Sequence, residues 1–304
     1  MQLSIKEGKI TWVEIKNPVE EDIDWLKKKF NLHPLVLKEL LPRLDYPKIE
    51  IFGDYIFLVL FYPFFNKETC QTIPFELDLI VAKDYLITSH YKDIVPLKAI
   101  FDKCNLYEDF RKEVFSQGTA YILYLLLQEI LNASFPKLSH IKWNIEKIEK
   151  EIYQRQNKDT VAGISLITRD IIGFQRVLEP QKLILERLKK AAEKIFGEKF
   201  LPYFSELINL HEEINGLLKT LKNTLSALDS TNSSLLNTKT NEIIKILTIF
   251  SVILLPLTLI TSLFNINTQF LPLVNNPAVF WIILGAMAFL ATAMSIFFKI
   301  KKWI

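Results

Sequence analysis

A stretch without any charged residue, close to the end of the chain, dictates which folds are available. From Ile246 to Phe298 the sequence contains no Asp, Glu, Lys, Arg or His. A transmembrane helix needs about 20 mostly apolar residues, and this block divides into two such lengths, roughly 243–264 and 278–298. The alternative is a buried hairpin in a soluble core, which is the weaker interpretation because two charge-free spans of this length are rare in soluble folds. The sequence therefore predicts two membrane helices.

The distribution of lysine predicts how these spans are oriented. Five lysines border the two spans on one side, whereas the intervening loop 265–277 has none: Lys239, Lys245, Lys299, Lys301 and Lys302. Positive residues stay on the cytoplasmic side, so both termini are expected in the cytoplasm and the loop outside. We therefore expect a multi-pass protein of the cell (inner) membrane.

Composition excludes several other classes of protein. The first residues, MQLSIKEGKITWVEIK, lack a basic segment followed by an apolar one, so we expect no signal peptide. Cys70 and Cys104 are far apart and match no metal or redox spacing. The net charge of +3 is too small to indicate nucleic acid as a partner. No nucleophile, phosphate-binding loop or paired carboxylates stand out, so we expect neither an enzyme nor a cofactor.

The first part of the chain, 1–115, has the alternation of a cytoplasmic mixed α/β domain. Helical patterns cover Glu20–Phe30 and Pro34–Leu41, and Pro63, Pro74 and Asp84 are expected at turns. Four short β-type runs complete the domain: Lys9–Ile15, Tyr55–Tyr62, Phe75–Val81 and Tyr85–His90.

Residues 116–242 are predicted to form a helical hairpin and a stalk. Two stretches, 118–157 and 162–196, are expected to pair in antiparallel fashion, with interruptions at Pro136 and Pro180. A third helix is expected to run from Phe204 to Phe264 without a break. Leucines and isoleucines of its first half follow a coiled-coil spacing and predict a packing seam: Leu207, Leu210, Ile214, Leu217, Leu221, Leu225 and Leu228.

The first predicted span carries a polar stripe. Its members follow spacings of three, four and seven, with Ile244 and Leu255 filling the gaps: Asn241, Thr248, Ser251, Thr258, Ser262 and Asn265. Such small polar residues can pack membrane helices together. They can also line water, whereas exposure to lipid is costly. The stripe ends in the uncharged, amide-rich loop, which favours a water-filled conduit. Two helices cannot enclose a pore, so a conduit requires several copies of the chain, with Leu247, Leu255 or Ile244 forming narrow apolar rings that gate by dewetting.

Several segments resemble the CorA family of magnesium and cobalt transport proteins. The segment NEIIKILTIFSVILLPLTLITSLFNIN (241–267) resembles that family's first membrane helix, and FKIKKWI (298–304) resembles its basic C-terminus. Two more segments, NLHPLVLKELL (31–41) and YPKIEIFGDYIFLVL (46–60), resemble its cytoplasmic domain. The resemblance implies a funnel-shaped homopentamer with two membrane helices per chain and a pore lined by the first of them. It also implies a Gly-Met-Asn motif that holds a hydrated divalent cation at the outer mouth.

This chain departs from the family at that motif, which reads Asn265-Ile266-Asn267. The zinc-transporting ZntB branch has Gly-Ile-Asn, so Ile266 has a precedent among relatives. Asparagine is among the better substitutes for glycine at unusual backbone angles. A ring of Asn267 amide oxygens can accept hydrogen bonds from the waters of Mg²⁺, which gives up water reluctantly, and Asn265 either adds a second ring or caps the helix.

The resemblance also suggests where the protein is regulated. Glu206 falls where the family has an acidic residue that binds a regulatory divalent ion between subunits, and the alternative is a solvated helix carboxylate. Lys299, Lys301 and Lys302 would form a basic collar at the cytosolic mouth. The expected function is passage of Mg²⁺, with Co²⁺ and Ni²⁺ as further candidates. A non-conducting sensor or scaffold and a ZntB-like zinc transporter are the alternatives.

Overall fold

The computed structural model describes residues 2–41, 43–154, 158–265, 278–301 and 303. It divides into two compact units, Met1–Asp229 and Ser230–Ile304. The first unit contains a six-stranded sheet in the order β1-β2-β6-β5-β4-β3, in which only the β2–β6 pair is parallel. The strands are β1 Gln2–Glu7, β2 Ile10–Lys16, β3 Lys48–Phe52, β4 Tyr55–Asn66, β5 Gln71–Val81 and β6 Tyr85–His90.

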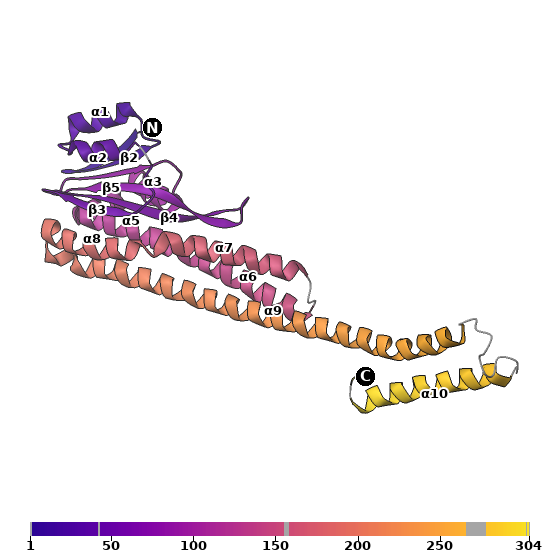
Figure 1. Ribbon diagram of the computed structural model, residues 1–304. Coiled ribbons are helices and arrows are strands. Elements are labelled where there is room, and N and C mark those ends of the chain that lie inside the picture. Colours follow the sequence, from indigo (N-terminus) through magenta and orange to yellow (C-terminus); the bar gives the residue numbers. More distant parts are fainter. Residues whose placement is uncertain (1, 42, 155–157, 266–277, 302, 304) are drawn as a thin grey trace. The chain divides into compact units, whose positions relative to one another are not determined.

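Helices cover both faces of this sheet (Figure 1). The short helices α1 and α2 lie on one face over the core that contains Val13, Phe57 and Ile80. Helices α5, α7 and α8 pack on the other face. The helix bounds of the first unit are α1 Glu20–Lys29, α2 Pro34–Glu39, α3 Val95–Leu106, α4 Glu108–Ser116, α5 Thr119–Asn132, α6 Ser134–Gln154, α7 Lys158–Leu178, α8 Gln181–Phe196 and the 3-10 turn Glu198–Phe200. The prediction of a mixed α/β domain is confirmed.

The prediction that Pro63 and Pro74 lie at turns is wrong. Both are within strands, and they stand directly opposite each other in the β4–β5 pair. Proline is tolerated there because this part of the hairpin extends beyond the rest of the sheet. The neighbouring strands pair only as far as Val59 in β4 and Leu77 in β5, so no third strand needs the missing N–H groups.

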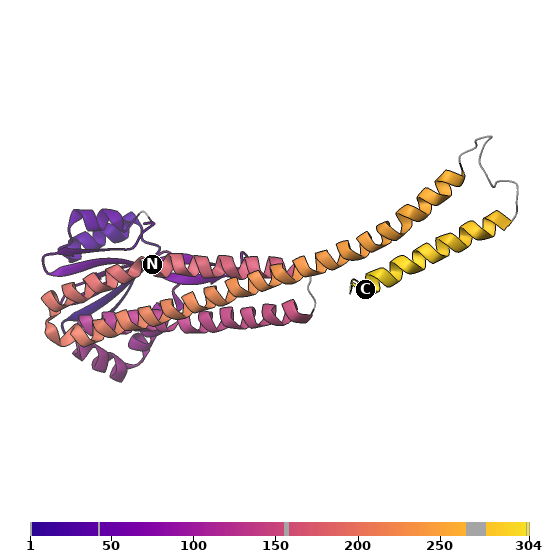
Figure 2. The ribbon, with the colours of Figure 1, turned by 60° about the horizontal axis from the view of Figure 1, so that its bottom comes forward.

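Breaks in the long helices fall close to the prolines that predicted them. Helix α5 ends at Asn132 and α6 begins at Ser134, so Pro136 lies in the first turn of α6. Pro180 lies between α7 and α8. Helices α6 and α7 contact each other as the expected hairpin (Figure 2). Helix α9, Leu201–Phe264, is uninterrupted, as predicted, and the next helix among the described residues is α10, Ala278–Ile300.

Two members of the predicted seam on α9, Leu210 and Leu217, are wrong, each by one residue. Leu217 is 44% exposed, whereas the next residue, Leu218, is fully buried. The buried positions are 207, 211, 214, 218, 225 and 228, which keep the coiled-coil period once His211 is included. The buried His211 ring fills a leucine position because its Nε2–H donates to the Leu178 carbonyl at the end of α7, 2.9 Å away. Burial lowers the pKa of His211, so it serves as a neutral packing residue.

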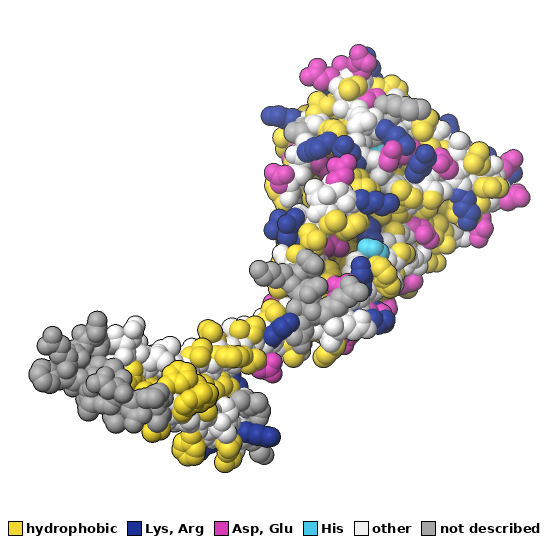
Figure 3. Space-filling view, turned by 90° about the vertical axis from the view of Figure 1, so that its right-hand side faces the viewer, with side chains coloured by type: hydrophobic (Ala, Val, Ile, Leu, Met, Phe, Trp, Pro, Cys, Tyr) yellow, Lys and Arg dark blue, Asp and Glu magenta, His cyan; other side chains and the backbone are white. Residues whose placement is uncertain are grey.

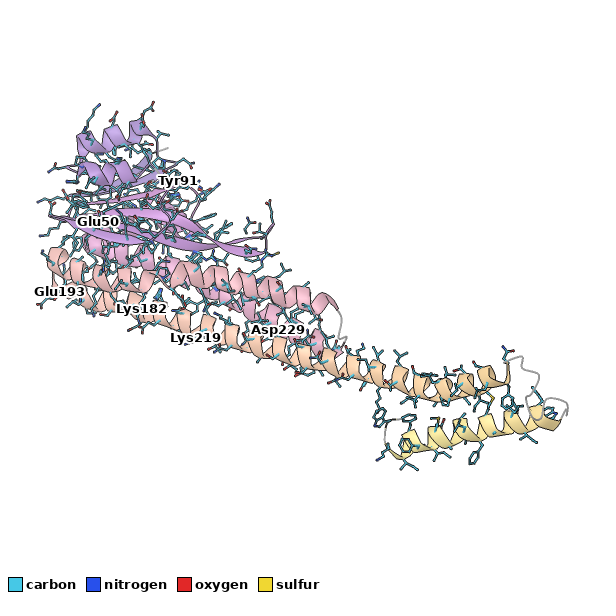
Figure 4. The ribbon with its side chains drawn as sticks, in the orientation of Figure 1. Glu50, Tyr91, Lys182, Glu193, Lys219 and Asp229 are labelled. Atoms are coloured by element: carbon cyan, nitrogen blue, oxygen red, sulfur yellow. The ribbon has the colours of Figure 1, made fainter. Side chains whose placement is uncertain are left out.

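Helix α8 is also tied to α9 at the surface. The Nζ atom of Lys182 lies 2.7 Å from a carboxylate oxygen of Glu212 (Lys182 is labelled in Figure 4). Both side chains are about half exposed, so this pair adds little stability and the seam supplies most of the packing.

Gly173 sets the distance between α7 and the β4–β5 hairpin. A Cβ atom at this position would lie 2.5 Å from the Thr72 carbonyl oxygen in β5. We expect Gly173→Ala to lower the melting temperature of the detergent-solubilised protein, since backbone must move by several tenths of an ångström, at a cost of about 1–3 kcal/mol. Gly216→Ala on α9 is the control, because nothing lies near its Cβ and alanine favours the helix by about 1 kcal/mol. Equal melting temperatures for the two variants would contradict the close approach.

A buried carboxyl predicts how stability changes with pH. Asp78 of β5 is 1% exposed, and neither of its oxygens has a hydrogen-bond partner among the described residues. Glu76 stands two residues away on the same face and accepts the Leu44 N–H at 2.9 Å. Glu39 lies nearby and pairs with Lys48, which also pairs with Glu50 (labelled in Figure 4) at 3.1 Å. Burial, reinforced by the charge of Glu76, raises the pKa of Asp78 well above its usual range.

We therefore expect Asp78→Asn to raise the melting temperature, by a margin that grows as the pH rises from 4 to 8. A carboxyl whose folded pKa is raised stabilises the fold at low pH and loses that contribution as pH rises through the folded pKa. The amide mimics the protonated form, and relief of the unpaired charge is worth about 1–3 kcal/mol. The exposed Asp24→Asn variant controls for net charge. A melting-temperature difference that does not depend on pH would show that Asp78 keeps one protonation state throughout.

Candidate functional site

Two helices among the described residues are long and apolar enough to cross a membrane, judged by length and composition alone. They are Glu198–Phe264, whose charge-free part follows Lys245, and Phe280–Ile300. The bent pair Glu108–Ser116 and Thr119–Gln154 would add a third if it were one span, but α5 in that pair packs on strands β5 and β6. Figure 3 shows hydrophobic side chains gathered over the apolar helices and mixed charges over the first unit.

Within the second unit, one flank of α9 is covered. Ile249 is 6% exposed, and Ile253, Pro256, Leu257 and Ile260 are half-buried. These positions recur every three or four residues and therefore share one side of the helix. Helix α10 is the other helix of this unit in the part of the chain that is described, and it lies alongside α9 in both ribbon views (Figures 1 and 2). The covered flank is thus the α10-facing flank.

The predicted stripe lies on the other side of α9. Thr248 is half-buried. The other stripe residues, including the leucines and the isoleucine predicted to form apolar rings, are exposed: Asn241, Ile244, Leu247, Ser251, Leu255, Thr258, Ser262 and Asn265. At about 100° per residue, the stripe is rotated well away from the α10-facing positions. Packing against α10 therefore does not explain the stripe.

The hydroxyl groups of the stripe present acceptor oxygens. The Oγ1–H of Thr248 donates to the Ile244 carbonyl at 2.8 Å, and the Oγ–H of Ser251 donates to the Leu247 carbonyl at 2.9 Å. Thr258 donates to the Leu255 carbonyl at 2.8 Å. The hydrogens are used within the helix, which leaves oxygen lone pairs facing outward. The hydroxyls of Thr292 and Ser295 on α10 also donate to backbone carbonyls of their own helix. The stripe on α9 is therefore distinguished by the alignment of its polar residues along one exposed flank, and not by these hydrogen bonds.

Pro256 adds a further acceptor that the sequence interpretation missed. In a regular helix the Val252 carbonyl would accept the N–H of residue 256, which proline lacks. That carbonyl oxygen is therefore left for another donor, close to Leu255 in the stripe. Proline inside an apolar helical pattern was the signal that could have identified it.

The predicted entry motif is only partly described. Asn265 directly follows α9, and its backbone N–H is shared between the Thr261 and Ser262 carbonyls at 3.1 and 3.2 Å. Ile266 and Asn267 lie outside the described residues. At the other end of the unit, Lys299 and Lys301 are exposed, whereas Lys302 is outside the described residues. Trp303 packs its ring against Phe298 at 5.8 Å, a contact that the sequence analysis did not predict.

Glu206 belongs to a separate contact in the first unit. Its carboxylate accepts the Tyr124 hydroxyl at 2.8 Å and the Gln128 side-chain amide at 3.1 Å, so it joins α9 to α5. Burial and the Glu206 charge raise the pKa of Tyr124, so the tyrosine remains a donor. Among the described residues, no group of three or more His, Cys, Asp and Glu side chains is arranged to hold a metal ion. Glu206 is exposed and remains available to a further partner.

Comparisons with known proteins identify the fold and the family. The chain is 26% identical to the cobalt/magnesium transport protein CorA of Thermotoga maritima, over 97% of this chain and 83% of that protein. It is 24% identical to the protein of the same description from Methanocaldococcus jannaschii, over 100% of this chain and 94% of that one. The complete structure of the CorA magnesium transporter from Methanocaldococcus jannaschii has the same fold, with a TM-score of 0.86, 23% identity, and coverage of 99% of this chain and 94% of that chain.

The family model described as CorA-like Mg²⁺ transporter protein matches residues 7–302. That is a family of membrane transporters and not of enzymes, which agrees with the two apolar helices. Because the match extends over nearly the whole sequence, the chain belongs to the CorA-like Mg²⁺ transporter family.

Proposed function

We propose that this CorA-type divalent-cation transporter passes hydrated Mg²⁺ along the exposed polar stripe of α9. The observation that carries the proposal is that the stripe lies on the flank of α9 that α10 does not cover. Its outward oxygens are acceptors, and the waters around a cation are hydrogen-bond donors. The pathway can therefore hold a hydrated ion without removing its water, which Mg²⁺ gives up reluctantly.

Several copies of the chain must assemble for this flank to enclose water. We propose a homopentamer in which one α9 from each chain lines the axis and α10 lies outside, next to lipid. The exposed Leu247 and Leu255, together with Ile244, would then form apolar rings that close the pathway by dewetting. We further propose 1–115 and 116–242 as the cytoplasmic parts and 265–277 as the outer loop, with both termini inside the cell.

Entry and regulation extend the same proposal. A ring of Asn267 amides would receive the hydrated ion, and Asn265, two residues earlier in the chain, would add a second ring. Glu206 would gain a divalent ion when a neighbouring chain supplies further oxygen ligands, because the described residues of one chain hold no group of three or more His, Cys, Asp and Glu side chains that could bind a metal ion. Lys299, Lys301 and Lys302 would form a positive collar on the cytosolic side.

Ion flux into proteoliposomes tests the proposal. We expect saturable Mg²⁺ uptake, with Co²⁺ and Ni²⁺ competing and Zn²⁺ entering more slowly, since the stripe offers no His or Cys ligand for zinc. The relatives named for magnesium and cobalt transport support this order. Absence of uptake for all four ions by a correctly assembled oligomer would instead indicate a scaffold, and faster Zn²⁺ than Mg²⁺ uptake would indicate a zinc transporter.

A further inference from the structure

A cleft of about 550 Å³ opens between the tip of the β4–β5 hairpin and helices α6 and α7. A second hollow of about 270 Å³ adjoins it, and the two share Phe65, Lys67, His140 and Asp170. Small-molecule sites have volumes of about 300–1,000 Å³, so the cleft is of suitable size. It lies wholly within the first unit, in the part of the hairpin beyond Pro63 and Pro74, and none of its lining residues belongs to the stripe.

The walls of this cleft are held by close contacts. Gly163 of α7 packs so tightly on α6 that a Cβ atom would come within 2.4 Å of Ile148 Cδ1. Gly173 brings the same helix against the Thr72 carbonyl. At the hairpin tip, the Asn66 side chain accepts the backbone N–H groups of Glu68 and Thr69 at 2.9 and 3.4 Å. The cleft is therefore a formed cavity and not a gap between loosely placed elements.

Lys137, which lines the second hollow, carries an incompletely satisfied ammonium group. Its Nζ atom is buried and has no hydrogen-bond acceptor among the described residues. It lies 4.1 Å from the centre of the Tyr62 ring. This cation–π contact replaces only part of the stabilisation that hydration would give the ammonium group. Burial lowers the pKa of Lys137 to about 8, although Asp170 opposes the shift. A buried ammonium without an acceptor is costly, and an anionic ligand would satisfy it.

The nearest carboxylate is already engaged elsewhere. Asp170 is 6% exposed and accepts the Thr72 hydroxyl at 2.6 Å, so it holds α7 to β5. Lys67 and Lys147 also line the cleft, and Glu151 is the other acidic residue besides Asp170 among its lining residues. Three lysines and two carboxylates therefore line the two adjoining hollows, which favours binding of an anion.

Aromatic surface lies beside these cations. The rings of Phe65 in β4 and His140 in α6 are 5.9 Å apart, and His140 stacks on Trp143 at 6.2 Å. A planar ring can pack against such a surface, with a contribution of about 1 kcal/mol beyond the buried area. The two adjoining hollows therefore offer both lysine side chains and an aromatic side.

We propose that this cleft binds a small organic phosphate that carries a planar ring, of which a nucleoside polyphosphate is the simplest example. The phosphate would take hydrogen bonds from Lys137, Lys67 and Lys147, and the ring would pack on Phe65 and His140. Lysine is a common phosphate ligand because it supplies a point charge with three donors. The site lies in the cytoplasmic α/β unit and is independent of the ion pathway proposed above.

Titration calorimetry on the full-length protein in detergent tests this site, with ATP as the probe and no divalent cation present. We expect saturable ATP binding that is at least about tenfold weaker in Lys137→Met, since a charge-assisted hydrogen bond is lost. Lys142→Met is the matched control: it lies on the same helix, is exposed and pairs only with Glu146 among the described contacts, so ATP should bind it as it binds the unmodified protein.

Phe65→Ala distinguishes the contribution of the ligand's planar ring from that of its phosphate groups. Tripolyphosphate should bind this variant as well as it binds the unmodified protein, whereas ATP should lose its advantage over tripolyphosphate. Unchanged melting temperature and elution volume establish that each variant is folded. The proposal is overturned by absence of saturable ATP binding, by equal ATP affinity in Lys137→Met, or by equal affinity of the unmodified protein for ATP and tripolyphosphate.

Discussion

Replacing Asn267 with alanine is expected to reduce Mg²⁺ flux by at least about a hundredfold while leaving assembly intact. In the proposed pentamer the change removes five amide oxygens from one ring. Each hydrogen bond to a water of the hydrated ion contributes about 0.5–1.5 kcal/mol, so a ring of five contributes roughly 2.5–7.5 kcal/mol, and a hundredfold change corresponds to about 2.8 kcal/mol. Alanine leaves no group that could take over the contact. The measurement is initial Mg²⁺ uptake into proteoliposomes at matched protein content.

Asn275→Ala is the matched control for this experiment. It removes the same amide from the same uncharged stretch but lies outside the Asn-Ile-Asn motif. We expect flux within about twofold of the unmodified protein, because surface substitutions away from a binding site have small effects. Equal flux in Asn267→Ala and the unmodified protein would exclude an amide ring at residue 267 as the entry site.

The four strands expected from the sequence are the four inner strands of the sheet, and the two that were missed are its edges. Strands β2, β6, β5 and β4 carry long buried runs, which give a strong pattern. Strand β1 buries only Ile5, and β3 is half-buried along most of its length. An edge strand packs on one side only and needs fewer apolar residues, so its sequence resembles that of a loop.

Errors elsewhere came from rules that tertiary context overrides. Proline is excluded from a strand only where a neighbouring strand requires a backbone N–H at that position. The described strands beside β4 and β5 do not reach Pro63 and Pro74, so both prolines can lie within strands. Leucine spacing on α9 failed at Leu210 and Leu217 because the seam runs through the next residues, His211 and Leu218, and His211 is held there by its bond to the Leu178 carbonyl. Neither the length of a sheet extension nor the partner of a buried histidine is encoded in a local pattern.

The stripe could be predicted because residues three, four or seven positions apart lie on one side of any regular helix, and α9 is continuous through this segment. Which flank α10 covers could not be predicted, because α10 is apolar all round and gives no directional signal. The cleft beside α6 was missed for another reason. Its lysine and aromatic residues come from a hairpin and a helix some 70 residues apart in sequence, so only the fold brings Phe65 and Lys137 to one cavity.

Thr258→Leu is expected to reduce Mg²⁺ flux at least about tenfold. Thr258 is exposed on the stripe, one turn from Leu255, and its hydroxyl oxygen is an outward acceptor. Leucine removes that oxygen and adds bulk, and in a ring of chains it would place a second apolar ring next to Leu255. Two adjacent apolar rings favour dewetting of the pathway between them. Uptake assays in proteoliposomes at several Mg²⁺ concentrations measure the effect.

Two variants distinguish loss of the pathway from loss of packing. Thr258→Ser keeps the acceptor oxygen and should retain flux within about twofold, because only a methyl group is removed from an exposed position. Thr292→Leu makes the same chemical change on α10, where the hydroxyl also donates to a carbonyl of the preceding turn, that of Ala288, and the side chain is also exposed. Because α10 lies on the lipid side in the proposed assembly, this variant should conduct normally. If Thr258→Leu conducts as well as Thr292→Leu, the exposed flank of α9 does not line the ion pathway, and small polar residues there must be explained by contacts between chains.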